Sequence, residues 1–363
     1  MKLDIVKIAK DVFKDKELIL EDVGKEKVKI DYLAKRGDYN RKSFVFPKMI
    51  LVNEWFMEGL GLYLGDGDFH RKEKRHTSFT SKDKDIAVCF LGFLRSYFTI
   101  KNKDITTLIV YKKGNNNLKK EWSNALNIDT QRILTKQSNR HKEETCQIQV
   151  NGIIFRKIFE NVIKHIANSN FLLKSNFRRA FLKGIFAAEG SVGIQYNDGK
   201  HYINQITLSI STEEKELRKL ICKSLDFETI PCRIYIDKKR NSLTINISGW
   251  DDYFKLWNIH IFDLCERKKQ KFMIIAKNLD IYLKLDAKFR AEFFKSLQMT
   301  QREIAKKIDS WQANVCRTIE GKHLLRIEQI QQLLSYCSYN MKEVLDRTSL
   351  IRVGGLIELK PRS

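Results

Sequence analysis

Two acidic residues stand at matching places in a stretch that the sequence uses twice. The first copy is residues 59–67, GLGLYLGDG, and the second is residues 182–190, LKGIFAAEG. Each copy is typical of an apolar helix that ends in an acid, Asp66 or Glu189, followed by a glycine. A carboxylate in the last turn faces the negative end of the helix dipole, which costs roughly 0.3–1 kcal/mol. Two such ends side by side would also repel each other, so we expect a cation between these two acids.

A divalent cation such as Mg²⁺ or Mn²⁺ would meet this need. Hard cations prefer carboxylate, carbonyl and water oxygens. The two acids supply carboxylates, and the frayed end of each helix also offers a free backbone carbonyl. The sequence therefore predicts metal ligands at Asp66, Glu189, Gly65 and Ala188.

Small residues in both copies predict how the two helices pack. Gly61 and Gly65 stand four residues apart in the first copy, as do Gly184 and Ala188 in the second. Faces of this kind let two helix backbones touch. The glycine after each acid suits the left-handed position that stops a helix. Either copy alone could be an ordinary amphipathic helix with a glycine cap, but two matched copies favour a structural repeat.

The paired stretches resemble those of the LAGLIDADG homing endonucleases, and the resemblance covers roughly residues 45–280. It implies an α+β fold of two pseudo-symmetric αββαββα halves, joined at the motif helices, with an antiparallel β saddle over DNA. It further implies that Asp66 and Glu189 bind catalytic metals. Lys183 in place of a small residue, and Glu rather than Asp at 189, depart from the commonest pattern. Both acids occur at that place in the family, so activity is not excluded.

The activity that the resemblance implies is that of a site-specific endonuclease for double-stranded DNA. Such an enzyme hydrolyses a phosphodiester in each strand with the help of metal and leaves short 3′ overhangs. A single chain with two motifs implies a monomer that binds a long asymmetric site. Two alternatives stay open: a DNA-binding regulator and an RNA-splicing maturase, each derived from such a nuclease. Retention of both acids favours the enzyme.

The charge balance also favours a polyanionic partner. Lys and Arg number 67 against 44 Asp and Glu, a formal net charge of +23. A surplus of this size is typical of nucleic-acid-binding proteins, although a lysine-rich soluble surface is the alternative. Clustering strengthens the first interpretation, with basic runs at Arg71, Lys72, Lys74 and Arg75; Lys112 and Lys113; Lys238, Lys239 and Arg240; and Arg267, Lys268, Lys269 and Lys271.

Other features of the sequence indicate the cellular compartment in which the protein works. The seven cysteines are scattered, with no Cys-x-x-Cys pair, which argues against a zinc site or a disulfide framework and for a reducing interior. No apolar run reaches the ~18 residues that a membrane span needs, and no signal peptide is evident. The ends of the chain lack the Cys or Ser and the His-Asn of inteins. We therefore expect a free-standing, cytoplasmic protein, for which an intron-encoded origin is one option.

Alternating polar positions on the expected strands could read DNA. Within residues 145–150 and 205–211, and in two later strands, apolar residues alternate with Gln, Asn, Thr, Ser or Arg. Such faces are usually solvent faces, but a two-stranded ribbon also fits the major groove, where Gln and Asn pair with adenine and Arg with guanine. The resemblance selects the second interpretation for a set of candidate DNA contacts: Gln147, Gln149, Gln195, Gln205, Arg233 and Asn246.

Two lysines are candidate catalytic residues. In the family, a basic residue in each half flanks the cleft and polarises the water around the scissile phosphate. Lys164, 25 residues before Glu189, and Lys268, after the last helix of the second half, stand at such places. Lys269 is the next candidate. A solvated surface lysine is the alternative for each of them.

The pattern from residue 286 onward predicts helices only. Residues 299–321 resemble a phage-repressor helix-turn-helix, with Ala305 at the crossing and Asp309 in place of the usual turn glycine. Asp enters the left-handed region more easily than most residues. The second helix would then present Gln312, Asn314 and Arg317 to DNA. A bundle that serves only for packing is the alternative.

These patterns predict four segments. Residues 1–50 form an N-terminal segment that is either a DNA-contacting arm or a structural lead-in. Residues 51–170 and 171–285 form the two LAGLIDADG-like halves, and residues 286–363 form a small all-α DNA-binding domain.

Overall fold

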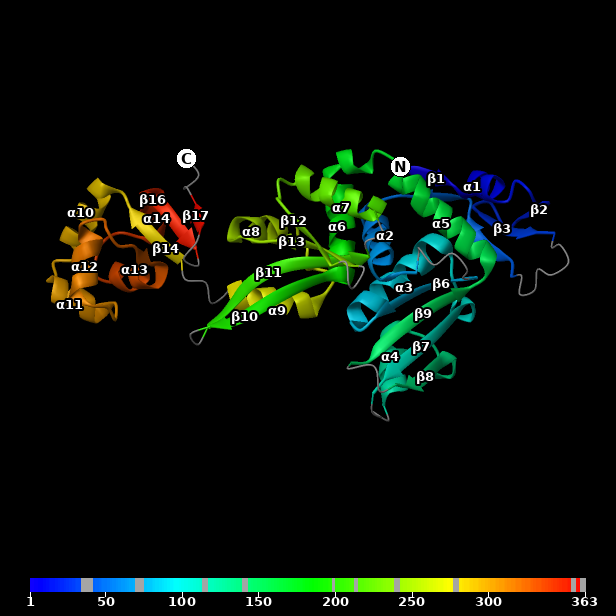
Figure 1. Ribbon diagram of the computed structural model, residues 1–363, viewed down its shortest axis with the longest axis horizontal. Helices are drawn as coiled ribbons and strands as arrows, with labels where there is room; N and C mark the ends of the chain where they lie inside the picture. The colour runs from blue at the N-terminus through cyan, green and yellow to red at the C-terminus, as the bar shows by residue number, and fades with distance from the viewer. Residues whose placement is uncertain are drawn as a thin grey trace. The chain divides into compact units, whose positions relative to one another are not determined.

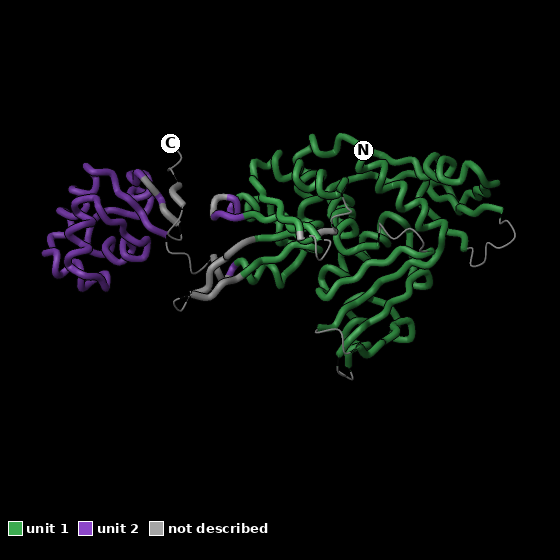
Figure 2. The backbone as a smooth tube through the Cα atoms, viewed as in Figure 1, with its two compact units in different colours: residues 1–194, 203–247, 255–272 green, residues 195–202, 248–254, 273–363 purple. Residues whose placement is uncertain are grey.

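A computed structural model describes residues 1–33, 42–68, 75–112, 117–138, 143–197, 200–211, 215–237, 242–276, 281–353 and 357–359. The chain divides into two compact units (Figure 2). Unit 1 comprises residues 1–194, 203–247 and 255–272, and unit 2 comprises residues 195–202, 248–254 and 273–363. Helices and mainly antiparallel sheets make up both, so the fold is α+β as the sequence predicts (Figure 1). None of the helices in these residues is long and apolar enough to cross a membrane.

The N-terminal segment forms a layer over one helix of the first half. It contains β1 (Lys2–Asp4), α1 (Ile5–Val12), β2 (Leu18–Asp22), β3 (Lys27–Tyr32), β4 (Phe44–Pro47) and β5 (Met49–Leu51). Strands β2, β3 and β4 form an antiparallel sheet, and β1 pairs with β5. The rings of Phe44 and Phe46 pack on Phe155 of α5 (Ile153–Ala167), with centroids 5.6 and 6.1 Å apart. These contacts join the N-terminal segment to the first half.

The first half carries an insertion that the sequence did not predict. Its elements are α2 (Glu54–Asp66), β6 (His76–Ser81), α3 (Lys84–Phe98), β7 (Ile105–Tyr111), α4 (Leu118–Leu126), β8 (Ile133–Gln137), β9 (Thr145–Asn151) and α5, with short 3₁₀ turns at Asn102–Asp104 and Thr130–Arg132. The sheet order is β6-β9-β7-β8, and β8 pairs with β7 in parallel. The expected αββαββα order is thus interrupted by α4 and β8, and the sheet is not antiparallel throughout. Helices α3 and α5 pack on β9 (Figure 1).

The second half follows the predicted order. A 3₁₀ turn at Phe171–Leu173 leads into α6 (Ser175–Glu189), β10 (Gly190–Asn197), β11 (Lys200–Ser211), α7 (Lys215–Phe227), β12 (Arg233–Asp237), β13 (Ser242–Ile247) and α8 (Trp250–Asn258). Helix α9 (Glu266–Ala276) comes after this series. The sheet order is β10-β11-β13-β12.

The C-terminal part is not all-α, so that prediction was wrong. It contains α10 (Ala287–Ser296), α11 (Gln301–Lys307), α12 (Gln312–Ile319), α13 (Ile327–Leu334) and α14 (Met341–Asp346). It also contains a sheet of β14 (Ile281–Leu285), β15 (Leu325–Arg326), β16 (Thr348–Val353) and β17 (Ile357–Leu359), in the order β15-β14-β16-β17. Leu283 and Leu285 of β14 are buried in one apolar cluster with the helices. The predicted boundary at 286 is too late, since β14 lies before it. Its partner β16 lies more than 60 residues later, and local sequence patterns cannot show that pairing.

Candidate functional site

The two repeated helices touch along their small residues, as the sequence predicts. A Cβ atom added to Gly184 of α6 would lie 2.7 Å from the backbone nitrogen of Leu62 and 2.8 Å from Cα of Gly61. A Cβ atom added to Gly65 would overlap Cβ of Ala188. Because any side chain at these places would push the helices apart, the small faces set the spacing of α2 and α6. Their C-terminal ends, and with them the two acids, are thereby brought together.

The departure at Lys183 has a structural explanation. Its Nζ atom lies 3.1 Å from Oε1 of Glu58 on α2, and both side chains are mostly buried. The lysine therefore forms an ion pair across the helix pair rather than disturbing it. Near the start of the helices, Asn176 donates to Glu54 at 3.0 Å.

The glycines after the acids do not adopt the left-handed conformation that the sequence predicted. Gly67 has φ −87° and Gly190 has φ −68°, and both are extended. The need for glycine is instead steric. A Cβ atom at Gly67 would overlap the carbonyl oxygen and ring of Tyr63, and one at Gly190 would overlap the carbonyl oxygen of Phe186. Each glycine lets the chain leave its helix directly into the next segment.

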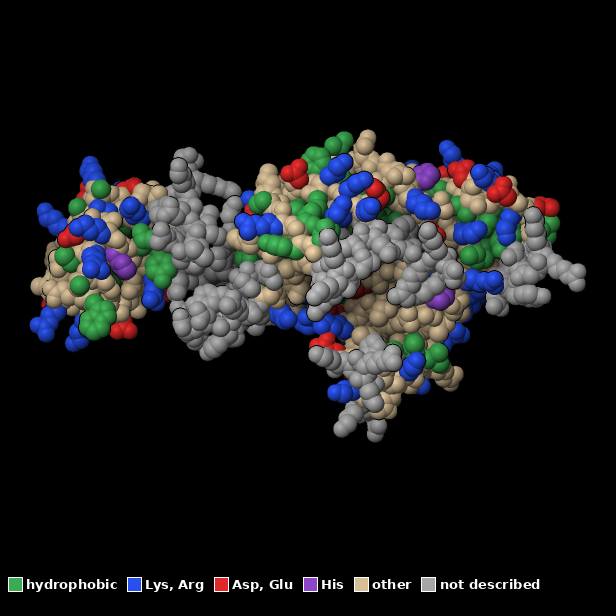
Figure 3. All heavy atoms as spheres, in the orientation of Figure 1, with side chains coloured by type: hydrophobic (Ala, Val, Ile, Leu, Met, Phe, Trp, Pro, Cys, Tyr) green, Lys and Arg blue, Asp and Glu red, His purple; other side chains and the backbone are tan. Residues whose placement is uncertain are grey.

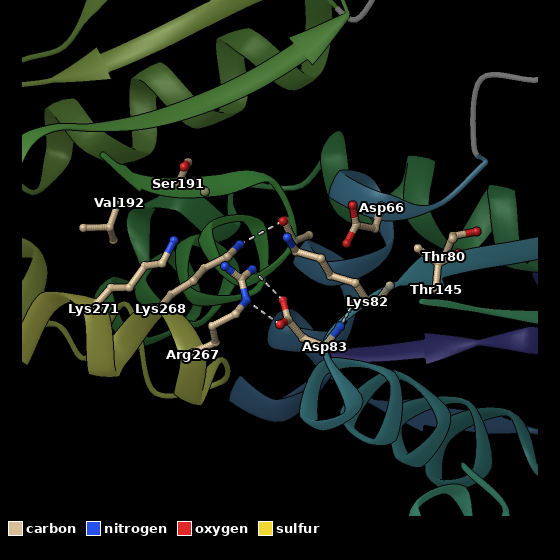
Figure 4. A pocket seen from close by; sticks show the side chains of 13 residues that line it. Asp66, Thr80, Lys82, Asp83, Thr145, Ser191, Val192, Arg267, Lys268 and Lys271 are labelled. Atoms are coloured by element: carbon tan, nitrogen blue, oxygen red, sulfur yellow. Dashed lines mark hydrogen bonds and ion pairs between the residues drawn. The ribbon is translucent and has the colours of Figure 1, made fainter. Parts of the chain in front are cut away.

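A cavity of about 400 Å³ opens at the joined helix ends (Figure 4). Basic and acidic side chains meet there with hydroxyl groups and backbone. The lining consists of Asp66, Thr80, Ser81, Lys82, Asp83, Thr145, Ala188, Gly190, Ser191, Val192, Arg267, Lys268 and Lys271. Figure 3 shows Lys and Arg side chains gathered over the region of α9. The cavity thus combines a predicted catalytic acid, Asp66, with a cationic wall formed by Lys82, Arg267, Lys268 and Lys271.

Lys268 is the predicted catalytic lysine that the structure brings to this cavity. Its side chain is 4% exposed, and Nζ donates to the carbonyl oxygens of Phe186 at 2.9 Å, Ala188 at 2.9 Å and Ala187. These are carbonyls at the C-terminal end of α6, where a cation is favoured by the helix dipole. The carbonyl of Ala188, predicted as a metal ligand, therefore accepts a hydrogen bond from Lys268.

The electrostatics of Asp66 are unusual for a surface acid. Asp66 is half-buried, and burial raises the pKa of its carboxyl from 3.8 to about 7. Nearby Lys268 opposes this rise, and Asp83 adds to it. Burial likewise lowers the pKa of Lys268. A desolvated carboxylate at a helix C-terminus lacks full charge compensation.

Glu189 lies close to the first acid but is not one of the residues that line the cavity. It is half-buried as the last residue of α6. A Cβ atom added to Gly65 would lie 3.3 Å from its Cγ, so the Glu189 side chain lies against the residue before Asp66. The two predicted acids therefore lie at the adjoining C-terminal ends of α2 and α6.

The donor set fits a hexacoordinate cation that keeps waters. Among the residues that the structure describes, no group of three or more His, Cys, Asp or Glu side chains surrounds a single point. Two carboxylates with remaining positions for water and phosphate are typical of Mg²⁺ sites. Asp66 and Glu189 would hold the ion, and the raised pKa of Asp66 indicates that added positive charge is favoured there.

An ion pair that the sequence did not predict fixes the cationic wall. Arg267 Nε donates to Oδ1 of Asp83 at 2.6 Å, and its second nitrogen donates to Oδ2 at 2.9 Å. Asp85 accepts from the backbone nitrogen of Glu266 at 2.7 Å. These acids at the start of α3 hold the start of α9. The only sequence signal was the charged SKDKD run at 81–85, in which two Lys alternate with two Asp.

The other lysines lie elsewhere. Lys164 is exposed on α5 and does not line the cavity, so the structure does not bring it to Asp66. Lys269 pairs with Asp263 at 3.0 Å and also lies outside the lining. Lys82, which no sequence pattern singled out, lines the cavity from the first half and bonds Glu143 at 2.6 Å.

The polar face of the first sheet runs into the cavity. Gln147, Gln149 and Thr145 share one face of β9, because alternate residues of a strand point the same way. Gln147 stands opposite Thr80 of β6. Thr145 and Thr80 both line the cavity. The predicted DNA contacts Gln147 and Gln149 therefore continue the surface on which Asp66 opens.

The second sheet has a similar polar row. Asn246 of β13 stands between Thr207 of β11 and Arg233 of β12, and Arg233 is exposed. Gln195 lies on β10 and Gln205 on β11, but their side chains are outside the described part of the chain. The basic residues at 71–74, 113 and 238–240 also fall outside the described residues.

In unit 2, helices α11 and α12 pack on each other. Ile304, Ala305, Ile308 and Val315 are buried in the apolar cluster. Asp309 has φ 46°, the left-handed conformation expected of it. The three predicted contacts lie on α12: Gln312 and Arg317 are exposed, and Asn314 is half-buried.

Comparisons with known proteins give distant likenesses only. No protein-family model and no curated protein matches the chain. Among solved structures, I-DmoI in complex with DNA and Mn has a TM-score of 0.33 at 16% identity, covering 57% of this chain and 97% of that one. The N-terminal LAGLIDADG domain of DUF199/WhiA has 0.34 at 17%, covering 57% and 81%. Full-length DUF199/WhiA from Thermatoga maritima has 0.35 at 13%, covering 79% and 93%. The structural neighbours are thus of LAGLIDADG type, at identities and TM-scores too low to assign a family.

Proposed function

We propose that the chain is a site-specific endonuclease that hydrolyses both strands of double-stranded DNA with the help of a divalent metal. The observation that carries this proposal is the site at the ends of α2 and α6. Asp66 opens there, with a pKa of about 7, into a cavity with a cationic wall. The cavity is continuous with a polar strand face that suits base edges.

Two related halves support a substrate with two strands. After its motif helix, the first half has strands in the order β6-β9-β7, and the second has β11-β13-β12. In each set the middle strand of the sheet, β9 or β13, comes last in the sequence. In each set a helix, α3 or α7, also follows the strand that comes first in the sequence. We interpret this as pseudo-symmetry of the kind that the resemblance implies. Each acid would then serve one strand, and acids this close would cut across the minor groove and leave short 3′ overhangs.

We assign different roles in this reaction to individual residues of the cavity and its surroundings. Asp66 and Glu189 would hold Mg²⁺ or Mn²⁺, which when bound activates water and stabilises the leaving oxygen. Lys268 holds the end of α6 through its carbonyls and supplies a fixed positive charge beside Asp66. Lys82 and Lys271 line the cavity as phosphate contacts. Arg267 is held by Asp83 and keeps α9 in place.

The substrate that fits is a long asymmetric site bound by a monomer. The first sheet presents Gln147 and Gln149, which suit adenine, while the second presents Arg233, which suits guanine. Different polar side chains on the two sheets would read different half-sites. We further propose that unit 2 adds a helix-turn-helix contact through Gln312, Asn314 and Arg317, outside the stretch that the sheets cover.

The test is cleavage of a DNA library with Mg²⁺, followed by two isosteric substitutions. Asp66→Asn and Glu189→Gln should each abolish double-strand cleavage of the selected target, while DNA is still bound in Ca²⁺. The substitutions keep shape and remove charge, so binding that survives separates loss of chemistry from loss of fold. Full cleavage by either variant would falsify the assignment.

One observation favours a second candidate, a DNA-binding regulator without nuclease activity. Lys268 already supplies positive charge to the carbonyl of Ala188 at 2.9 Å, where a metal ligand was predicted. A protein that only binds DNA could use this lysine in place of a metal. Sequence-specific binding with no cleavage in Mg²⁺ or Mn²⁺, and with no change on Asp66→Asn, would select the regulator.

A further inference from the structure

A buried ion pair that the proposed reaction does not use lies two residues after the first acid. Asp68 follows Asp66 and Gly67, and its carboxylate accepts from Nη1 of Arg156 on α5 at 3.3 Å. The side chains of Asp68 and Arg156 are 6% and 4% exposed. Burial removes the hydration of both charges, so each needs the other as a partner. The pair therefore belongs to the interior of the first half rather than to its surface.

Further hydrogen bonds join Asp68 to three elements of the first half. Its Oδ1 atom accepts from the hydroxyl of Tyr63 on α2 at 3.1 Å and from the backbone nitrogen of Ser78 on β6 at 2.9 Å. Its own backbone nitrogen donates to the carbonyl of Ser78 at 3.1 Å. Arg156 donates to the backbone carbonyl of Asp68 at 3.3 Å and to that of His76 on β6 at 2.5 Å. These contacts, which we call the Asp68 anchor, hold the chain as it leaves α2.

The position of Asp66 explains why such an anchor is needed. Asp66 is the last residue of α2, where helices fray, and the next residue is Gly67, which has wide backbone freedom. Without the anchor, the last turn could unwind and turn the carboxylate away from the cavity. Strand β6, which the anchor also holds, carries Thr80 and Ser81 of the cavity lining. The same contacts therefore position the acid and one wall of the cavity.

The second copy of the repeat has no carboxylate at the matching place. Ser191 follows Gly190, where Asp68 follows Gly67 in the first copy. Ser191 is exposed and lines the cavity, whereas Asp68 is buried and is not one of the lining residues (Figure 4). The chain is therefore held differently after the two acids, and loss of the Asp68 anchor should affect the first acid alone.

We propose that Asp68 and Arg156 are positioning residues for the cleavage of one DNA strand. Their ion pair fixes the last turn of α2, and with it the direction of the Asp66 carboxylate. This inference rests on the proposed function, in which each acid serves one strand. Neither Asp68 nor Arg156 lines the cavity, so both act through Asp66. A displacement of about 1 Å can cost roughly 10²-fold in rate, so a loosened Asp66 should slow its own strand while Glu189 still serves the other.

The experiment is single-turnover cleavage in Mg²⁺ of the target selected from the DNA library, with a different label on each strand. Asp68→Asn keeps the oxygen that accepts from Tyr63 and Ser78 but removes the charge that pairs with Arg156. It should slow one strand about tenfold or more relative to the other, so that nicked DNA accumulates, while binding in Ca²⁺ stays unchanged. The double variant Asp68→Asn/Arg156→Met, which removes both charges of the pair, should slow the same strand by at least as much.

Arg178→Met is the matched control, because Arg178 and Glu228 form a similarly buried ion pair in the second half. Arg178 lies near the start of α6, eleven residues before Glu189. Thermal unfolding should show that Arg178→Met is destabilised, as the double variant is, because each loses a buried pair. The ratio of the two strand rates should nevertheless stay at the wild-type value in Arg178→Met.

The outcomes separate this inference from the proposed function. A wild type that binds the target but cuts neither strand would refute the proposed function, and this inference with it. A wild type that cuts both strands, with an unchanged strand ratio in Asp68→Asn and in the double variant, would leave the nuclease and overturn the positioning role. A ratio that shifts equally in Arg178→Met would overturn it as well, because the effect would then follow from lost stability alone.

Discussion

At the scale of single residues, the site depends on how burial changes the charge of two groups. Asp66 and Lys268 come from elements 200 residues apart, and each influences the pKa of the other. Burial disfavours the charged form of both, so their mutual attraction only partly compensates for lost hydration. An added divalent cation would complete the compensation. This balance can be tested without measuring cleavage.

We predict that ionisation of Asp66 lowers the stability of the metal-free folded chain as the pH rises. The unfolded carboxyl releases its proton near pH 3.8 and the folded one near pH 7. Between these values the folded chain holds the extra proton, so stability should fall as the pH rises through this window. Asp66→Asn should remove that loss and melt at a higher temperature than the wild type at pH 8.

The measurement is thermal unfolding in a chelating buffer, repeated with Mg²⁺. Mg²⁺ should raise the melting temperature of the wild type at pH 8 but not that of Asp66→Asn. Asp263→Asn, a change at a more exposed acid paired with Lys269, is the matched control and should keep the wild-type pH dependence. Equal responses of all three chains would show that Asp66 binds no metal.

We predict different outcomes for the two candidate lysines. Lys268→Met keeps an apolar stem but leaves the carbonyls at the end of α6 without their donor. Loss of a buried partner should cost about 1–3 kcal/mol of stability and slow single-turnover cleavage, with DNA affinity nearly unchanged. Lys164→Ala, at an exposed position outside the cavity, should change neither the stability nor the cleavage rate. A rate loss in Lys164→Ala equal to that in Lys268→Met would show that the first-half lysine acts in catalysis after all.

The sequence alone identified candidate residues in the repeated stretches. It missed residues that contacts between distant parts of the chain bring to the cavity. Asp66 and Glu189 follow from the two motif copies, and Lys268 follows from the family resemblance that those copies carry. The pair of Asp83 and Arg267 does not, because 184 residues separate them and nothing local distinguishes either from a solvated surface charge. Lys164 was chosen by its position relative to Glu189, which does not reveal the face of α5 on which it lies.

At the scale of elements, the helix pair is the feature that the sequence predicts best. Spacing of small residues sets which faces meet, and the structure confirms the contact at Gly61 and Gly184. The insertion of α4 and β8 was not predicted, because β8 pairs with β7 in parallel and no local pattern reveals that pairing. The strands of the C-terminal unit were missed for a related reason. Strand β14 pairs with β15 and β16, which lie far from it along the chain, so no local alternation reveals this sheet.

We predict that Gly184→Ala separates the helix pair. The new Cβ atom would overlap the Glu58 carbonyl oxygen and lie 2.7 Å from the nitrogen of Leu62, both backbone atoms that cannot give way. Overpacking of this kind should cost about 1–3 kcal/mol and shift both acids. Gly92→Ala on α3 is the control, since the nearest atom to its added Cβ lies 3.4 Å away on the Trp55 side chain. Urea unfolding should show Gly184→Ala destabilised, and Gly92→Ala unchanged or stabilised by up to ~1 kcal/mol.

At the scale of the whole molecule, the surplus charge is unevenly distributed along the chain. Residues 1–33 contain eight Lys and eight Asp or Glu. Residues 34–272 contain 43 Lys and Arg against 26 acids, and residues 273–363 contain 16 against 10. Residues 1–33 therefore add no net attraction for a polyanion, whereas residues 34–50 of the N-terminal segment carry five Lys and Arg against one Asp. The attraction expected for DNA resides in the proposed nuclease halves and, to a lesser extent, in the C-terminal segment.

The last prediction separates what the C-terminal part adds from what cleavage needs. A chain ending at residue 276 should fold, cut at unchanged positions and protect a shorter stretch of DNA at one end. Every phosphate that the shortened chain no longer neutralises should reduce the slope of log affinity against log salt by about 0.9. A chain ending at residue 285 is the matched control for the boundary. It keeps β14 without β15 and β16, exposing Leu283 and Leu285, which are 1% and 3% exposed in the intact chain. It should therefore aggregate more readily than the shorter chain. A footprint and salt slope that match the full chain after truncation at 276 would mean that α12 does not contact DNA.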